Sequence, residues 1–211
     1  IIVVLIVCLL SACSLWQAPQ QEPKVQDTPS VNPQQAKKLE KGLELMAEKN
    51  YQQAANLLDS FVVAYPTTEF DTIVLFNSAS AYEGLGKCRE AGKRYRRIVR
   101  SCAERFPRMG SRALLRLSYV YECLGHDQKL VASLVELRNY EKVLPPEIID
   151  AEVPARLAAA YARLGNHSEA QKQFVQAQKG LKVVQQKYRD EHVVELILAK
   201  TLFFMGRIDH L

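Results

Sequence analysis

From residue 35 onward, apolar residues recur along the chain at the spacing of one face of an α-helix. The clearest stretch runs from Leu75 to Ile98, where large apolar and small residues stand three and four positions apart. Positions i, i+3, i+4 and i+7 share one helical face, so the stretch predicts amphipathic helices. Gly86 interrupts the pattern where a left-handed backbone would end a helix. The stretch therefore predicts two helices joined by a tight turn.

The same arrangement returns along the chain with nearly constant spacing. The copy that begins at Leu75 reads Leu-x2-Ser-Ala-x2-Tyr-x3-Gly-x4-Ala-x3-Tyr-x2-Ile, and its first tyrosine, Tyr82, is followed by Tyr121 and Tyr161 at intervals of 39 and 40 residues. A weaker copy precedes these three, and residues 198–206 begin a fifth. We expect the small residues of each copy to let its two helices approach closely. These residues are Ala79, Ser118, Ala158, Ala91 and Ala170.

These spacings resemble the signature of the tetratricopeptide repeat (TPR) family. The resemblance covers about 175 residues and implies an all-α, right-handed superhelix of about 4.5 helix–turn–helix repeats, which bury their apolar faces against one another. We expect Pro66, Pro107 and Pro145 to follow the second helix of their repeats and to stop it from continuing. Because the fifth repeat is incomplete and the first residue is Ile1, we also expect the given sequence to be truncated at both ends. The expected repeats are 35–70, 71–110, 111–150, 151–190 and 191–211.

The N-terminal residues 1–12 are predicted to be a secretory signal. The apolar run 1–10 would form about 15 Å of helix, which is too short for a bilayer core of about 30 Å. Leu10-Ser11-Ala12-Cys13 resembles a bacterial lipobox, which implies lipidation of Cys13 and a new N-terminus there. Ser14 in the next position implies sorting to the outer membrane. An ordinary signal peptide and a truncated membrane helix are the alternatives.

Residues 13–34 are rich in Gln and Pro and lack helical periodicity, which predicts a disordered tether. About 20 flexible residues span roughly 25 Å. The tether would hold the repeats close to the membrane, facing the periplasm.

Positive charge is concentrated between Lys87 and Arg116, where the sequence has eleven basic residues and only two acidic ones, Glu90 and Glu104. The excess in this stretch is larger than the net charge of +5 of the whole chain. The stretch is either a solvated helix face or a site for an acidic partner surface, lipid headgroup or carboxylate.

Some TPR domains grip a C-terminal carboxylate with Lys, Asn and Arg on successive first helices. By resemblance, Asn77, Arg112 and Arg116 fall on three of these positions, whereas Leu39 and Leu43 replace the polar pair of the first repeat. We predict that Asn77, Arg112 and Arg116 form an anion-binding site in the concave groove. The candidates for further partner contacts are Arg94 and Arg97.

Cys88, Cys102 and Cys123 remain after the signal and the lipid site, and none has a metal-binding spacing. We expect three buried free thiols, with a Cys88–Cys123 disulfide as the alternative. The four histidines are dispersed, and no nucleophile elbow, phosphate loop or metalloprotease motif is present. The sequence therefore predicts no catalytic residues, no metal and no cofactor.

Together these features predict a lipid-anchored TPR scaffold that binds protein partners in its groove and assembles a cell-envelope complex. The pathway would be secretion, pilus, motility or outer-membrane assembly. The alternative is a module that binds an anionic or cell-wall ligand on the basic stretch 87–116. A lipid anchor would place the repeats outside the cytoplasm, so nucleic acid is not an expected partner.

Overall fold

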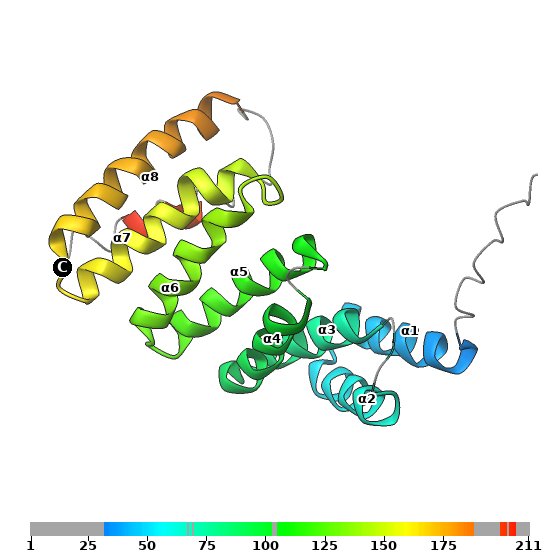
Figure 1. Ribbon diagram of the computed structural model, residues 1–211. Coiled ribbons are helices and arrows are strands. Elements are labelled where there is room, and N and C mark those ends of the chain that lie inside the picture. The colour runs from blue at the N-terminus through cyan, green and yellow to red at the C-terminus, as the bar shows by residue number, and fades with distance from the viewer. Residues whose placement is uncertain are drawn as a thin grey trace, which may run out of the picture. The chain divides into compact units, whose positions relative to one another are not determined.

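The computed structural model describes residues 32–66, 68, 70–102, 105–187, 199–201 and 203–205. The described residues contain eight α-helices, which Figure 1 labels α1 to α8, together with two short helices of other types and no strand. Residues 199–201 and 203–205 are helical as well. The elements are α1(Pro33–Ala47), α2(Tyr51–Ala64), α3(Asp71–Gly84), α4(Cys88–Cys102), α5(Pro107–Cys123), α6(Asp127–Leu137), η2(Arg138–Tyr140), η3(Ile148–Glu152), α7(Val153–Arg163) and α8(His167–Lys187). Residues 1–31, including the predicted lipid site Cys13, lie outside the described residues.

The helices form four successive pairs, as the repeat pattern predicts. The first helices of the pairs are α1, α3, α5 and α7, and the second helices are α2, α4, α6 and α8. From α2 to α8, each helix packs against the next one along the chain. The fold class is the all-α array of TPR-type repeats expected from the sequence.

Tight turns with a left-handed residue join the two helices of each pair. Gly86, Gly125 and Gly165 have φ angles of 69°, 67° and 74°, which confirms their predicted place at the end of a first helix. The first pair differs, because Lys49 occupies the equivalent position with a φ of 59°. A side chain at positive φ is strained, so this turn is less stable than the other three.

The core follows the small and large positions of the repeat. Ala79, Ser118, Ala158 and Ala91 are fully buried, and Ala170 is 4% exposed, so the predicted close approach of the helices is confirmed. The largest cluster of buried residues joins α3 to α7 and includes Tyr95, Leu114, Leu134 and Leu157. Since the second, third and fourth repeats share this cluster, these three pairs are held by continuous apolar packing.

The boundaries of the repeats differ from the predicted ranges in physically understandable ways. Pro107 does not merely follow α4 but begins α5, because proline is tolerated in the first helical turn, where its missing N–H has no helical partner. The extra length of the third repeat forms η2 and the π-helical η3, which leads directly into α7. None of the helices described in the chain is both long enough and apolar enough to cross a membrane.

Candidate partner-binding site

A cavity of about 520 Å³ lies between α3 and α5. Glu83 and Arg116 stand on its wall together with the ring of Tyr119. These three side chains come from the first helices of the second and third repeats. The other lining residues are Met46, Tyr51, Ser80, Gly84, Cys88, Val120 and Cys123.

An internal ion pair defines the charge of this cavity. The guanidinium of Arg116 donates to Glu83 Oε2 from Nε at 2.9 Å and from Nη2 at 2.7 Å. Tyr95 Oη also donates to Glu83 Oε2, at 2.6 Å. Burial, together with the negative charge of Glu83, raises the pKa of Tyr95, so its hydroxyl stays protonated and keeps donating. The charges of Glu83 and Arg116 on this wall therefore neutralise each other.

The ring of Tyr119, on the side of the array formed by the first helices, lies against two arginine side chains. The guanidinium carbon of Arg156 lies 3.9 Å from its ring centroid, and that of Arg116 lies 5.6 Å away. The Tyr119 hydroxyl donates to Glu152 Oε1. Burial and the nearby Glu152 carboxylate raise the pKa of Tyr119. Cation–π contacts of this kind hold a ring in place when the cation is desolvated.

Arg156 is fully buried in α7, an unusual place for a guanidinium group. Its Nη1 donates to Ser118 Oγ at 2.7 Å, and its Nε and Nη2 lie 3.3 and 3.2 Å from Glu122 Oε2. Arg156 is not among the site residues predicted from the sequence. An arginine within the alanine-rich run 155–162 was the available signal.

The helical residues 199–201 and 203–205 touch the same side of the array. Lys200 Nζ lies 5.3 Å from the Tyr119 ring centroid, and the Phe204 ring lies 5.6 Å from the guanidinium carbon of Arg156. Phe204 and Met205 are buried against Ala155 of α7 and Leu181 of α8. Phe203 is 62% exposed.

The predicted site residues fall on two sides of the array. Arg112 is exposed, with its guanidinium carbon 5.7 Å from the ring centroid of Phe76, which precedes Asn77. The Asn77 amide donates to the backbone oxygen of Ile73 at 2.9 Å. Arg116 shares the first-helix side with these two but is paired with Glu83. Their joint binding of an anion stays a prediction.

Arg94 and Arg97 lie on α4, a second helix, and so away from the predicted groove residues. Arg94 is bound to Asp59 of α2, whereas Arg97 is exposed. The basic stretch 87–116 is thus divided between internal ion pairs and a solvated face of α4.

The expectation of three free thiols is wrong for two of the cysteines. Cys88 and Cys123 form a disulfide with a Cα–Cα distance of 6.5 Å, which is within the range that a bridge requires. The tight turn before α4 and the end of α5 lie at the same end of their hairpins, which brings these cysteines together. The bridge lines the cavity between α3 and α5. The side chain of Cys102 lies outside the described residues.

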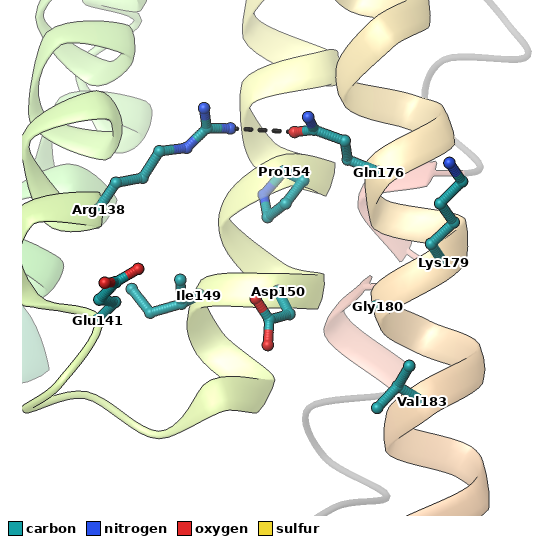
Figure 2. A pocket seen from close by; sticks show the side chains of 9 residues that line it. All are labelled: Arg138, Glu141, Ile149, Asp150, Pro154, Gln176, Lys179, Gly180 and Val183. Atoms are coloured by element: carbon teal, nitrogen blue, oxygen red, sulfur yellow. Dashed lines mark hydrogen bonds between the residues drawn. The ribbon is translucent and has the colours of Figure 1, made fainter.

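A second cavity, of about 470 Å³, lies between η2, α7 and α8 (Figure 2). Arg138 and Lys179 contribute positive charge to its lining, and Glu141 and Asp150 contribute negative charge. Gly180 lets α8 approach η3 closely, because a Cβ atom there would lie 1.9 Å from the backbone oxygen of Asp150. Among the described residues, no group of three or more His, Cys, Asp or Glu side chains could hold a metal ion.

Solved structures establish the class of fold. No family model and no curated protein matches the chain. It is similar to TPR-like repeats of Podosopora anserina described as a kinesin light chain, with a TM-score of 0.58 and 19% identity over 84% of this chain and 89% of the other. It is also similar to MamA of AMB-1, with a TM-score of 0.54 and 21% identity over 84% of this chain and 85% of MamA. The chain therefore has the fold of a TPR array.

Proposed function

We propose that this protein is a lipid-anchored TPR scaffold that binds a segment of a partner protein in the cavity between α3 and α5 and so assembles a cell-envelope complex. The observation that carries the proposal is the cavity itself. Its wall combines the rings of Tyr51 and Tyr119 with the polar groups of Glu83 and Ser80. Apolar walls with a few placed polar groups are typical of sites that bind a specific ligand.

Two features support the envelope location. The lipobox-like sequence that ends at Cys13 is the first. The second is the Cys88–Cys123 disulfide, since disulfides persist in oxidising compartments outside the cytoplasm and are rare inside it.

Site-specific photo-crosslinking in the cells that make this protein tests the binding site. A photoreactive phenylalanine analogue would replace Met46 or Tyr119 at the cavity, and Val63 of α2, which is 83% exposed, would serve as the control position. We expect the same protein adduct from both cavity positions and none from Val63. Adducts that form only at Val63 would refute the site.

The lipid anchor is tested separately. We expect wild type to carry the mass of a diacylglycerol group and to remain with membranes, whereas Cys13→Ser releases the protein to the soluble fraction. A soluble wild-type protein without the lipid mass would refute the anchor but leave the crosslinking result standing.

A module for an anionic or cell-wall ligand is the second candidate function. It is favoured by Arg97 and Arg100, which are exposed on α4 and form no ion pair with any described residue. Salt separates the two functions, because exposed charges are screened beyond about 8 Å at physiological ionic strength. Binding in the cavity should survive 0.5 M salt roughly unchanged, and binding to the α4 face should be lost.

A further inference from the structure

Side chains of the protein itself bridge the second helices of the first two repeats. Between α2 and α4, Arg94 Nε donates to Asp59 Oδ1 at 3.1 Å. Asp59 also accepts from Ser78 Oγ at 2.6 Å and from Tyr82 Oη at 2.9 Å. The Arg94 guanidinium carbon lies 4.0 Å from the Tyr82 ring centroid. A carboxylate and a guanidinium of the protein itself therefore join these two helices.

The helices α6 and α8 are bridged as well. Arg138, at the end of α6, donates from Nη2 to the side-chain oxygens of Gln173 and Gln176 on α8. Figure 2 shows the bond to Gln176, which is 3.3 Å long.

In the groove between α4 and α6, neither partner of the Asp59–Arg94 bridge is present at the equivalent position. Arg96 follows the buried Tyr95 as Asp59 follows the buried Leu58, so a cation replaces the carboxylate. Ser133 precedes the buried Leu134 as Arg94 precedes Tyr95, so a hydroxyl replaces the guanidinium. The Ser133 hydroxyl donates to its own helix, to the Leu130 backbone oxygen at 2.8 Å.

A cavity of about 230 Å³ remains in this groove. The side chains of Leu114, Leu117 and Tyr121, all less than 10% exposed, form its apolar floor. The charged lining residues are Arg96, Arg100, Lys129 and Glu136. None of these four forms an ion pair with any other residue that the structure describes. The cavity is thus an apolar slot with a net positive rim.

We propose that this slot is a second docking site, which binds an acidic segment of a partner protein. An apolar side chain of that segment packs on Leu117 and Tyr121, and a neighbouring carboxylate takes the place that Asp59 fills one repeat earlier. Arg96 and Arg100 pair with the carboxylate, since guanidinium groups bind carboxylates through two parallel hydrogen bonds. The site lies on the side of α5 that faces the second helices, so it is separate from the cavity lined by Arg116 and Tyr119.

The test uses the full chain and a fluorescein-labelled peptide, acetyl-Glu-Glu-Leu-Phe-Glu-amide, followed by fluorescence anisotropy. A peptide with Lys in place of each Glu is the probe control. The informative variant is Arg96→Asp/Ser133→Arg, which rebuilds the Asp59–Arg94 bridge inside the slot. Arg89→Gln is the matched control, because it changes the net charge by the same single unit on the same helix but outside the cavity.

We expect the acidic peptide to bind wild type and Arg89→Gln with equal affinity, and the rebuilt variant to bind at least about tenfold more weakly. The Lys peptide should not bind. Arg96→Gln/Arg100→Gln, with no new bridge, should weaken binding by a similar factor. Equal binding by all variants, equal weakening by Arg89→Gln, or no binding by wild type at millimolar peptide would each overturn the site. Crosslinking at the α3–α5 cavity is independent of these outcomes.

Discussion

The guanidinium of Arg156 in the fourth repeat stacks on the ring of Tyr119 in the third, with 3.9 Å between its central carbon and the ring centroid. The same guanidinium pairs with Glu122 of α5 and lies 3.7 Å from Glu152 of its own repeat. A single buried cation thus joins two repeats through an aromatic ring and two carboxylates.

Loss of that cation should destabilise the array. In Arg156→Leu, the carboxylate of Glu152, which is 2% exposed, loses the one ion-pair partner that it has among the described residues. Breaking a buried ion pair from one side costs about 3–5 kcal/mol. Urea unfolding should therefore show a lower free energy of unfolding by about that amount. The double variant Arg156→Leu/Glu152→Gln should recover most of the lost free energy of unfolding, because no buried charge is then left unpaired. A double variant as unstable as Arg156→Leu would assign the effect to packing.

The bridge between Asp59 and Arg94 predicts an acid-sensitive stability. Burial alone would raise the pKa of Asp59, but hydrogen bonds from Arg94, Ser78 and Tyr82 outweigh it and hold the pKa below the ordinary value of 3.8. A lowered folded-state pKa stabilises the fold above the unfolded-state value, and this stability is lost as the pH falls through the folded-state pKa. The free energy of unfolding should therefore decline more steeply below pH 3.8 in wild type than in Asp59→Asn. Parallel profiles would contradict this role.

Removal of the disulfide should destabilise the protein without changing its fold. Cys88 and Cys123 are 35 positions apart, and closing a loop of that length restricts the unfolded chain by about 3–4 kcal/mol in the chain-entropy view. Thermal unfolding of Cys88→Ser/Cys123→Ser should show this loss, with unchanged helical circular dichroism. Wild type in reducing agent should behave like the variant, and the variant itself should not respond to reductant.

A glycine in the first turn should stabilise the array. Lys49 has a φ of 59° where the other pairs have glycine. The left-handed conformation costs an L-residue about 1–2 kcal/mol, whereas glycine costs about 0.5–1 kcal/mol in extra unfolded-state entropy. Lys49→Gly should therefore raise the free energy of unfolding by about 0.5–1 kcal/mol. Gly86→Lys, the reverse change in the next turn, should lower it.

Close packing at Gly180 makes it intolerant of a methyl group. The added Cβ would meet the Asp150 backbone oxygen at 1.9 Å, whereas at Gly42 it would meet the flexible end of Leu58 at 2.6 Å. Gly180→Ala should therefore lower the free energy of unfolding by about 3 kcal/mol, against about 1 kcal/mol or less for Gly42→Ala. Denaturant titrations of the two variants compare them directly. A larger effect at Gly42 would show that η3 can move away from α8.

The repeat pattern predicted the fold because the buried positions are local and periodic. Gly86 indicates a turn, and Ala79 indicates a close approach of two helices, whatever the orientation of the helices in space. Both features can therefore be predicted from the sequence alone. The Cys88–Cys123 bridge was less accessible, since the choice between a bridge and free thiols depends on a distance between two hairpins.

The candidate site was predicted only in part, because charge pairing depends on contacts between repeats. Arg116 and Arg94 look alike in the basic stretch, but Glu83 and Asp59, each more than 30 positions away, neutralise them. Arg156 was not predicted as a site residue, since nothing in its own helix indicates that Tyr119 and Glu122 surround it. The open slot beside Arg96 could not be predicted either, because it is defined by the absence of a side-chain bridge that α2 and α4 form and that α4 and α6 do not.

The Cys88–Cys123 bridge also changes how the array can come apart. Tandem repeats melt from their ends, one unit at a time, because each unit is held only by its neighbours. A covalent link between the second and third repeats prevents these two repeats from separating. They should therefore unfold together as one cooperative block. The outer repeats would then fray around a persistent centre, and that centre holds both the cavity between α3 and α5 and the slot between α4 and α6. Both binding surfaces would therefore keep their shape even while the ends of the array are transiently unfolded.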